Sequence, residues 1–154
     1  MKSLPIVAAA FAAIASMSTG TPAQASPMDL GEAEQLRKLD IMLMVTSLRC
    51  RTSSDAFQKD YQRFTANQLT ELNTASRTLE GSMKKGGSAK AAKRALDRMS
   101  VGMANQYGNG HPWLSCGELK GVAQELAAAP DRRTLVLAAN DLLSPGPRQM
   151  AWRK

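Results

Sequence analysis

Cys50 and Cys116 are the only two cysteines of this 154-residue chain, and their pairing would constrain the fold more than any other feature of the sequence. An even number of cysteines in an oxidising compartment most often forms disulfides. A bond between positions so far apart closes a long loop, for which the chain-entropy model gives about 4 kcal/mol of stabilisation. A whole domain is stable by only ~5–15 kcal/mol. We therefore expect a Cys50–Cys116 disulfide if the chain is exported.

The first 25 residues predict export. Lys2 precedes a largely apolar, alanine-rich run over 4–14, and Ala-Gln-Ala follows at 23–25. This order is that of a secretory signal peptide, with cleavage expected after Ala25. The apolar run is shorter than the roughly 20 residues that span a bilayer, and no later segment reaches that length. We expect a periplasmic protein with no transmembrane segment after cleavage.

Residues 26–154 remain after cleavage, which is the length of one domain. Without Lys2 the chain has 19 cationic and 13 acidic side chains, a net charge of +6. Its last ten residues contain two prolines, a glycine and three cations but no acid. We expect a helical domain over 26–144, followed by a basic, flexible tail over 145–154.

Apolar residues recur at three- and four-residue intervals along this domain, which predicts helices. The first expected helix covers 30–51, and its second half should lie at the centre of the core because it is apolar almost all round. The second runs from N-cap candidates at 52–55 to about 84. Its apolar stripe indicates core packing and consists of Phe57, Tyr61, Phe64, Leu72, Ala75 and Leu79. Gln68 interrupts this stripe, which we interpret as a detail of packing.

Turn and capping residues separate the remaining helices. Paired glycines at 86–87 precede a third expected helix over 89–107, and Gly108 stands where a C-cap glycine belongs. Ser115 and Glu118 fit a capping box that begins a fourth helix, and a short apolar fifth covers 135–143. The expected fold is an all-α, single-domain bundle of four main helices plus a short fifth, with one disulfide.

The stretch 107–118 holds the residues best suited to a catalytic site: Tyr107, His111, Cys116 and Glu118. Cys116 is expected at a helix N-terminus, where the helix dipole lowers the pKa of a thiol, and His111 is a potential base. Catalysis by a thiolate requires that base about 3 Å from the sulfur. The stretch therefore has two interpretations, a structural connection closed by the disulfide or the site of a small exported enzyme of the hydrolase type.

Metal and cofactor sites have little support in the sequence. His111 is the single histidine, which excludes zinc sites with two or three histidines, and a disulfide removes the thiolate ligands. Non-covalent haem held by methionine and His111 is disfavoured because His111 adjoins a proline in an expected loop. No phosphate-binding glycine motif and no nucleophile elbow occurs. We expect no metal, no cofactor and no catalytic residues.

The strongest cluster of positive charge lies at 84–98, where one acid, Asp97, accompanies six cations. Such a face can be merely solvated, or it can bind an anionic partner such as an envelope component or an acidic periplasmic protein. Nucleic acid is not expected, because no aromatic residue is interleaved for base stacking. The candidate anion-binding residues are Lys84, Lys85, Lys90, Lys93, Arg94 and Arg98.

The segments LMVTSLRC at 43–50, YQRF at 61–64 and MANQYGNGHPWLSC at 103–116 resemble a group of uncharacterised small exported helical proteins of Gram-negative bacteria with paired cysteines. The resemblance covers most of the chain after Ala25 and implies a helical fold and a periplasmic location. Some of these proteins carry an adenosylhomocysteine-hydrolase label. This chain is too short for that enzyme and lacks the glycine fingerprint for NAD. We expect a non-catalytic periplasmic protein, structural or an interaction module.

Overall fold

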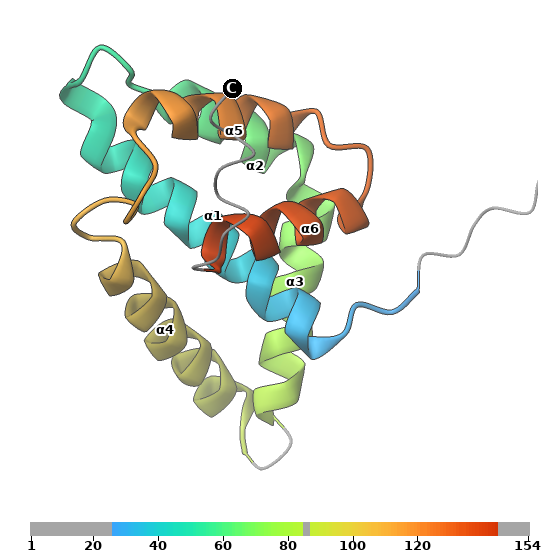
Figure 1. Ribbon diagram of the computed structural model, residues 1–154. Coiled ribbons are helices and arrows are strands. Elements are labelled where there is room, and N and C mark those ends of the chain that lie inside the picture. Colours follow the sequence, from blue (N-terminus) through green and yellow to red (C-terminus); the bar gives the residue numbers. More distant parts are fainter. Residues whose placement is uncertain (1–25, 85–86, 145–154) are drawn as a thin grey trace, which may run out of the picture.

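The computed structural model describes residues 26–84 and 87–144, and over these ranges every regular element is helical (Figure 1). The all-α, single-domain prediction is confirmed. The expected signal peptide over 1–25, Lys85 and the tail over 145–154 lie outside the described residues. The elements are α1 Leu30–Arg49, a 3₁₀ turn η1 Cys50–Thr52, α2 Gln58–Asn67, α3 Leu69–Met83, α4 Ala89–Gln106, α5 Cys116–Ala127 and α6 Arg132–Leu143.

The described residues form six α-helices, so the expectation of four main helices plus a short fifth is wrong. The second expected helix is two helices, because the chain breaks at Gln68 between α2 and α3. The side-chain amide of Gln68 is buried and donates hydrogen bonds to the carbonyl oxygens of Leu126 and Ala129, at 3.0 and 3.1 Å. Asn67 donates to the carbonyl of Ala127 at 2.9 Å. The break thus supplies side-chain donors to carbonyls at the C-terminal end of α5 and just after it, where Leu126 also accepts from the backbone N–H of Ala129 at 3.2 Å.

Short polar side chains begin four of the helices. Asp29 accepts a hydrogen bond from the backbone of Glu32 and forms a capping box with it at the start of α1. The predicted capping box of Ser115 and Glu118 begins α5, while Ser88 and Asp131 cap α4 and α6. Each cap satisfies backbone N–H groups that the first turn of a helix leaves unpaired. Because the cap of α6 is Asp131, this helix begins three residues before the predicted 135.

Helix α1 lies at the centre of the fold, and α2, α3, α4, α5 and α6 all contact it (Figure 1). The predicted apolar stripes are confirmed. Five of their side chains have 0 % of their surface exposed: Leu36, Leu39, Leu43, Phe57 and Phe64. The second half of α1 is less enclosed than expected, because its outer side leaves Met44 and Leu48 exposed. It ends at Arg49 and continues as the 3₁₀ turn, short of the predicted residue 51.

Two polar networks connect the helices across this core. Arg132, at the start of α6, places Nε 2.8 Å from Glu71 of α3 and Nη1 3.8 Å from Glu32 of α1. Tyr61 of α2 donates its hydroxyl hydrogen to Asp40 of α1 at 2.9 Å. Burial raises the pKa of the Asp40 carboxyl, although the bond from Tyr61 and the nearby Arg37 oppose that change. Such bonds fix the relative positions of helices that apolar packing alone would allow to slide.

No helix among the described residues is long and apolar enough to cross a membrane.

Candidate functional site

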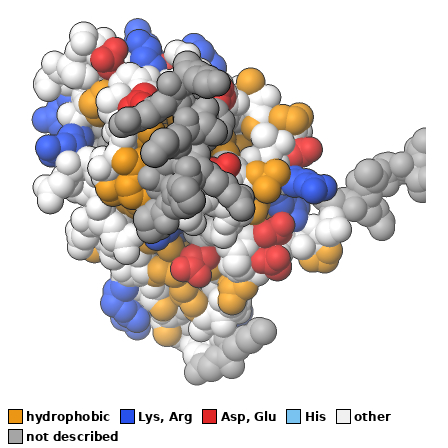
Figure 2. Space-filling model, in the orientation of Figure 1, with side chains coloured by type: hydrophobic (Ala, Val, Ile, Leu, Met, Phe, Trp, Pro, Cys, Tyr) orange, Lys and Arg blue, Asp and Glu red, His pale blue; other side chains and the backbone are white. Residues whose placement is uncertain are grey.

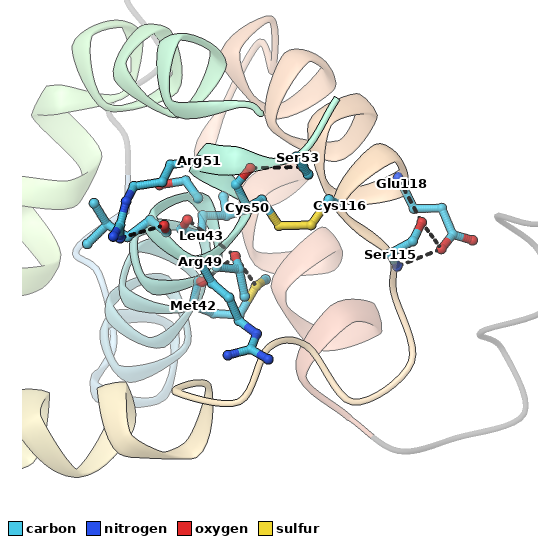
Figure 3. Close-up of a disulfide and its surroundings, with 12 residues drawn as sticks. Met42, Leu43, Arg49, Cys50, Arg51, Ser53, Ser115, Cys116 and Glu118 are labelled. Carbon is cyan, nitrogen blue, oxygen red and sulfur yellow. Dashed lines mark hydrogen bonds between the residues drawn. A yellow bond between two sulfur atoms is a disulfide. The ribbon is translucent and has the colours of Figure 1, made fainter. Parts of the chain in front are cut away.

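The predicted disulfide is confirmed, with Sγ atoms of Cys50 and Cys116 1.98 Å apart and Cα atoms 5.8 Å apart (Figure 3). It joins the turn after α1 to the first residue of α5. Cys50 is buried, while Cys116 is partly exposed. A pocket of ≈ 190 Å³ borders both sulfur-bearing residues, and Arg49 and His111 also line it. The disulfide is therefore a covalent link between two helix ends at the edge of the core.

The connection between α4 and α5 contains the glycine that the backbone requires. The expected C-cap glycine, Gly108, does not have a positive φ; Gly110 does, at 103°. A side chain at Gly110 would be strained there and would place a Cβ 3.3 Å from Nε of Arg49. Arg49 also donates to the carbonyl of Gly108 at 3.4 Å. The end of α1 thus packs directly against this connection.

Both ring nitrogens of His111 have backbone partners. Nε2 lies 3.1 Å from the carbonyl oxygen of Leu142, near the end of α6, and therefore donates to it. Nδ1 accepts from the backbone N–H of Leu114 at 3.2 Å and lies 3.5 Å from that of Trp113. These partners require the neutral tautomer with hydrogen on Nε2. His111 consequently joins the connection before α5 to the end of α6.

Aromatic contacts surround the same imidazole. The ring of Tyr107 stacks on His111 with centroids 6.0 Å apart, and the ring of Trp113 meets it edge-on at 4.8 Å. Burial lowers the pKa of His111, against the opposing effects of the Leu142 carbonyl and the Glu118 carboxylate. Burial also raises the pKa of Tyr107. The surroundings therefore favour the uncharged form of both rings.

The structure brings the four alternative site residues to one connection but gives each a structural contact. Cys116 is disulfide-bonded, and Tyr107 is buried in the core. Glu118 accepts hydrogen bonds from the backbone N–H and the hydroxyl of Ser115, both at 2.8 Å (Figure 3). A base role for His111 would first require one of its backbone bonds to break. Over the described ranges, no group of three or more His, Cys, Asp or Glu side chains could hold a metal ion.

The candidate anion-binding residues lie mainly on α4, at the edge of the fold. Figure 2 shows cationic side chains over the lower end of this helix. Lys90, Lys93, Arg94 and Arg98 are all exposed, and Lys84 is exposed at the end of α3. Between the parts of the chain that the structure describes, none of these five forms an ion pair. We call the four residues of α4 the cationic face.

A second pocket of ≈ 190 Å³ was not predicted from the sequence. It lies between α5, the end of α6 and the connection before α5, and we call it the α5–α6 pocket. Its walls combine apolar side chains with three carboxylates, and two glycines of α5 leave part of it bare. The lining residues are Trp113, Leu114, Gly117, Glu118, Gly121, Val122, Glu125, Asp141 and Leu142. The signal overlooked in the sequence was the spacing of Gly117 and Gly121, which places both on one face of a helix.

The comparisons with known proteins return no relative: no family model matches the chain, and no curated protein or solved structure is similar to it.

Proposed function

We propose that this protein is a non-catalytic helical module of the periplasm that binds anionic lipid headgroups through the cationic face of α4. The observation that carries the proposal is the arrangement of Lys90, Lys93, Arg94 and Arg98, which are exposed and unpaired with any described carboxylate. The opposite side of α4 supplies Ala92, Leu96 and Met103 to the interior. One side of the helix is thus available to a partner while the other is held by the fold.

The shape of this face favours an extended partner over a small ligand. Four cations at positions i, i+3, i+4 and i+8 lie on one side of a straight helix and span about 12 Å at 1.5 Å per residue. Asp97 is the one acid among them, and Val101, which is 60 % exposed, lies on the same side. None of the four cations lines one of the pockets described above. A convex row of charge matches a layer of headgroups better than a single anion.

The expected strength is that of a surface contact. Each Lys or Arg near an anionic leaflet contributes about 1 kcal/mol, so the four contribute about 4 kcal/mol before the repulsion from Asp97. Salt screens such contacts, because the Debye length is about 8 Å at physiological ionic strength. Binding should therefore be reversible and should weaken as salt is raised. The disulfide supports an oxidising compartment, where such a surface would meet envelope lipids.

Co-sedimentation with vesicles tests the proposal. The purified protein is mixed with phosphatidylcholine vesicles with and without phosphatidylglycerol, at low and raised salt. We expect binding only when phosphatidylglycerol is present. Glutamine at Lys90, Lys93, Arg94 and Arg98 should weaken it on the order of 10²–10³-fold. The matched control replaces four exposed cations elsewhere by glutamine and should bind nearly as well: Arg51, Lys59, Arg77 and Arg133.

Two results would overturn the proposal. One is equal vesicle binding by the native protein and by the variant of the cationic face. The other is the absence of binding to anionic vesicles at low salt, because the proposed contact is strongest there. Retention of the protein by an acidic protein column, together with no vesicle binding, would assign the cationic face to a protein partner instead. Circular dichroism checks that all variants remain helical.

A further inference from the structure

Two positions of α5 that have no side chain border the α5–α6 pocket. Gly117 and Gly121 are four residues apart in the first half of this helix, and both line the pocket. A Cβ at Gly121 would have no atom within 4 Å, so the backbone there is bare. Glycine inside a helix costs roughly 0.5–1 kcal/mol relative to alanine. Helix stability alone therefore does not account for glycine at Gly121, whereas access to the pocket does.

The size and chemistry of the pocket limit what it can hold. Its volume of ≈ 190 Å³ is below the roughly 300–1,000 Å³ of typical small-molecule sites, so it suits one large side chain better than a whole metabolite. Trp113, Leu114 and Val122 give it an apolar wall. Glu125 and Asp141 bring negative charge from two helices. An aromatic group flanked by cations is the complementary occupant.

The chain carries such a segment directly after α6. Trp152 is the second tryptophan of the sequence, and Arg148, Arg153 and Lys154 flank it without any acid. Leu142, a wall of the pocket, is separated from residue 145 by two residues only. The nine residues from Ser144 to Trp152 can span at most about 30 Å, which is ample for a return to the adjacent pocket.

We propose that the α5–α6 pocket is a binding site for the chain's own C-terminal segment, with Trp152 as the anchor and the neighbouring cations facing Glu125 and Asp141. Because the segment is tethered beside the pocket, its effective concentration is in the millimolar range, and modest affinity suffices to occupy it. The same segment of a second copy could bind only by competing with this tethered one. The site is independent of the cationic face of α4.

Tryptophan fluorescence measures this contact directly. In the W113F variant, Trp152 is the single tryptophan, and phenylalanine retains an aromatic ring beside His111. We expect blue-shifted emission and severalfold weaker quenching by acrylamide than for a synthetic peptide of residues 145–154. Neither quantity should depend on protein concentration. Emission and quenching equal to those of the free peptide would overturn the proposal, and a concentration-dependent blue shift would reassign the contact to a second copy.

Filling the pocket provides the decisive variant. Leucine at Gly121 should occupy the space intended for Trp152 and return its emission and quenching to the values of the free peptide. The matched control is Gly81→Leu on α3, where an added Cβ likewise meets no atom within 4 Å, and it should change neither quantity. In the E125Q/D141N double variant, the emission of Trp152 should shift partway toward that of the free peptide. Its quenching should no longer depend on salt. Unchanged Trp152 signals in both pocket variants would place the segment elsewhere.

Because Trp113 lines the pocket, its replacement could itself alter the site. A measurement on the native sequence controls for this effect. Protein labelled with 5-fluorotryptophan gives two fluorine signals, and the one lost in W152F belongs to Trp152. A Trp152 signal that is broad and insensitive to solvent isotope supports the docked segment. A sharp signal at the position found for the free peptide contradicts it.

Discussion

The Nε2 atom of His111 lies 3.1 Å from the carbonyl oxygen of Leu142, thirty-one residues later in the chain. The other ring nitrogen accepts from the backbone of Leu114. One imidazole thereby holds the connection between α4 and α5 against the end of α6. The residue that most suggested a catalytic base in the sequence has a structural position in the fold.

Replacing His111 by alanine should lower the free energy of unfolding by about 1–3 kcal/mol, because it leaves a buried carbonyl and a backbone N–H without partners. Urea unfolding followed by circular dichroism measures the loss. Asn109→Ala is the matched control, since Asn109 is exposed in the same connection. Equal stabilities of the two variants would contradict this role for His111.

His111 should also make stability depend on pH. Its folded-state pKa is lowered from the ordinary 6.5, so below that value the unfolded chain binds a proton that the folded chain does not. The contribution is complete above about pH 6.5 and is lost as the pH falls toward the folded-state pKa. Denaturant midpoints of the native protein and of His111→Gln, measured from pH 8 to pH 5, should therefore converge as acid is added. Parallel profiles would exclude the imidazole as the cause, because Asp40 and Asp131 titrate in both proteins.

Serine at Cys50 or at Cys116 should cost about 2–5 kcal/mol, the usual range for loss of a native disulfide. Guanidinium unfolding measures the cost, and the unfolded native protein should show two thiols only after reduction. When the folded protein is reduced, Cys116 should react with iodoacetamide before Cys50, because Cys50 is 4 % exposed and Cys116 begins α5. Unchanged melting temperatures in both serine variants would contradict the stabilising role.

Alanine at Gln68 should destabilise the protein by about 1–3 kcal/mol, because the carbonyls of Leu126 and Ala129 lose their side-chain hydrogen bonds and Leu126 keeps only backbone donors. Gln62→Ala, at an exposed site of α2, is the control and should stay within about 0.5 kcal/mol of the native protein. Hydrogen exchange should show the loss of protection at the end of α5. A loss of protection confined to α2 would indicate instead that Gln68 stabilises only the end of α2.

The sequence predicted those features that depend on neighbouring residues. Ser115 and Glu118 are three positions apart and cap α5 as expected. The apolar stripes likewise identified core residues such as Phe57 and Phe64. Capping hydrogen bonds and helical periodicity depend on residues close together in the sequence, so they can be predicted without knowledge of the fold.

The errors concern contacts between distant residues. The apolar stripe continues from α2 into α3, and only the carbonyls at the end of α5, some 58 to 61 residues away, explain the break at Gln68. The hydrogen bond from His111 to the carbonyl of Leu142 likewise could not be predicted from the residues next to His111 in the sequence. Gly108 was expected to be the C-cap glycine because it follows a helix, whereas the positive φ is at Gly110, which lies against Arg49. The α5–α6 pocket could not be predicted, because the spacing of Gly117 and Gly121 indicates a pocket only once the position of α6 beside α5 is known.

The contact between α1 and α6 determines when the domain can be completed. Arg132, in the last helix, reaches Glu32 in the first, so the side of α1 that α6 covers is open until nearly the whole domain sequence has been synthesised. A ribosome-bound fragment that ends before α6 exposes this apolar side to chaperones and cannot close around it. The part of α1 that faces α6 is therefore the last to be buried, and the complete domain forms only once α6 is present.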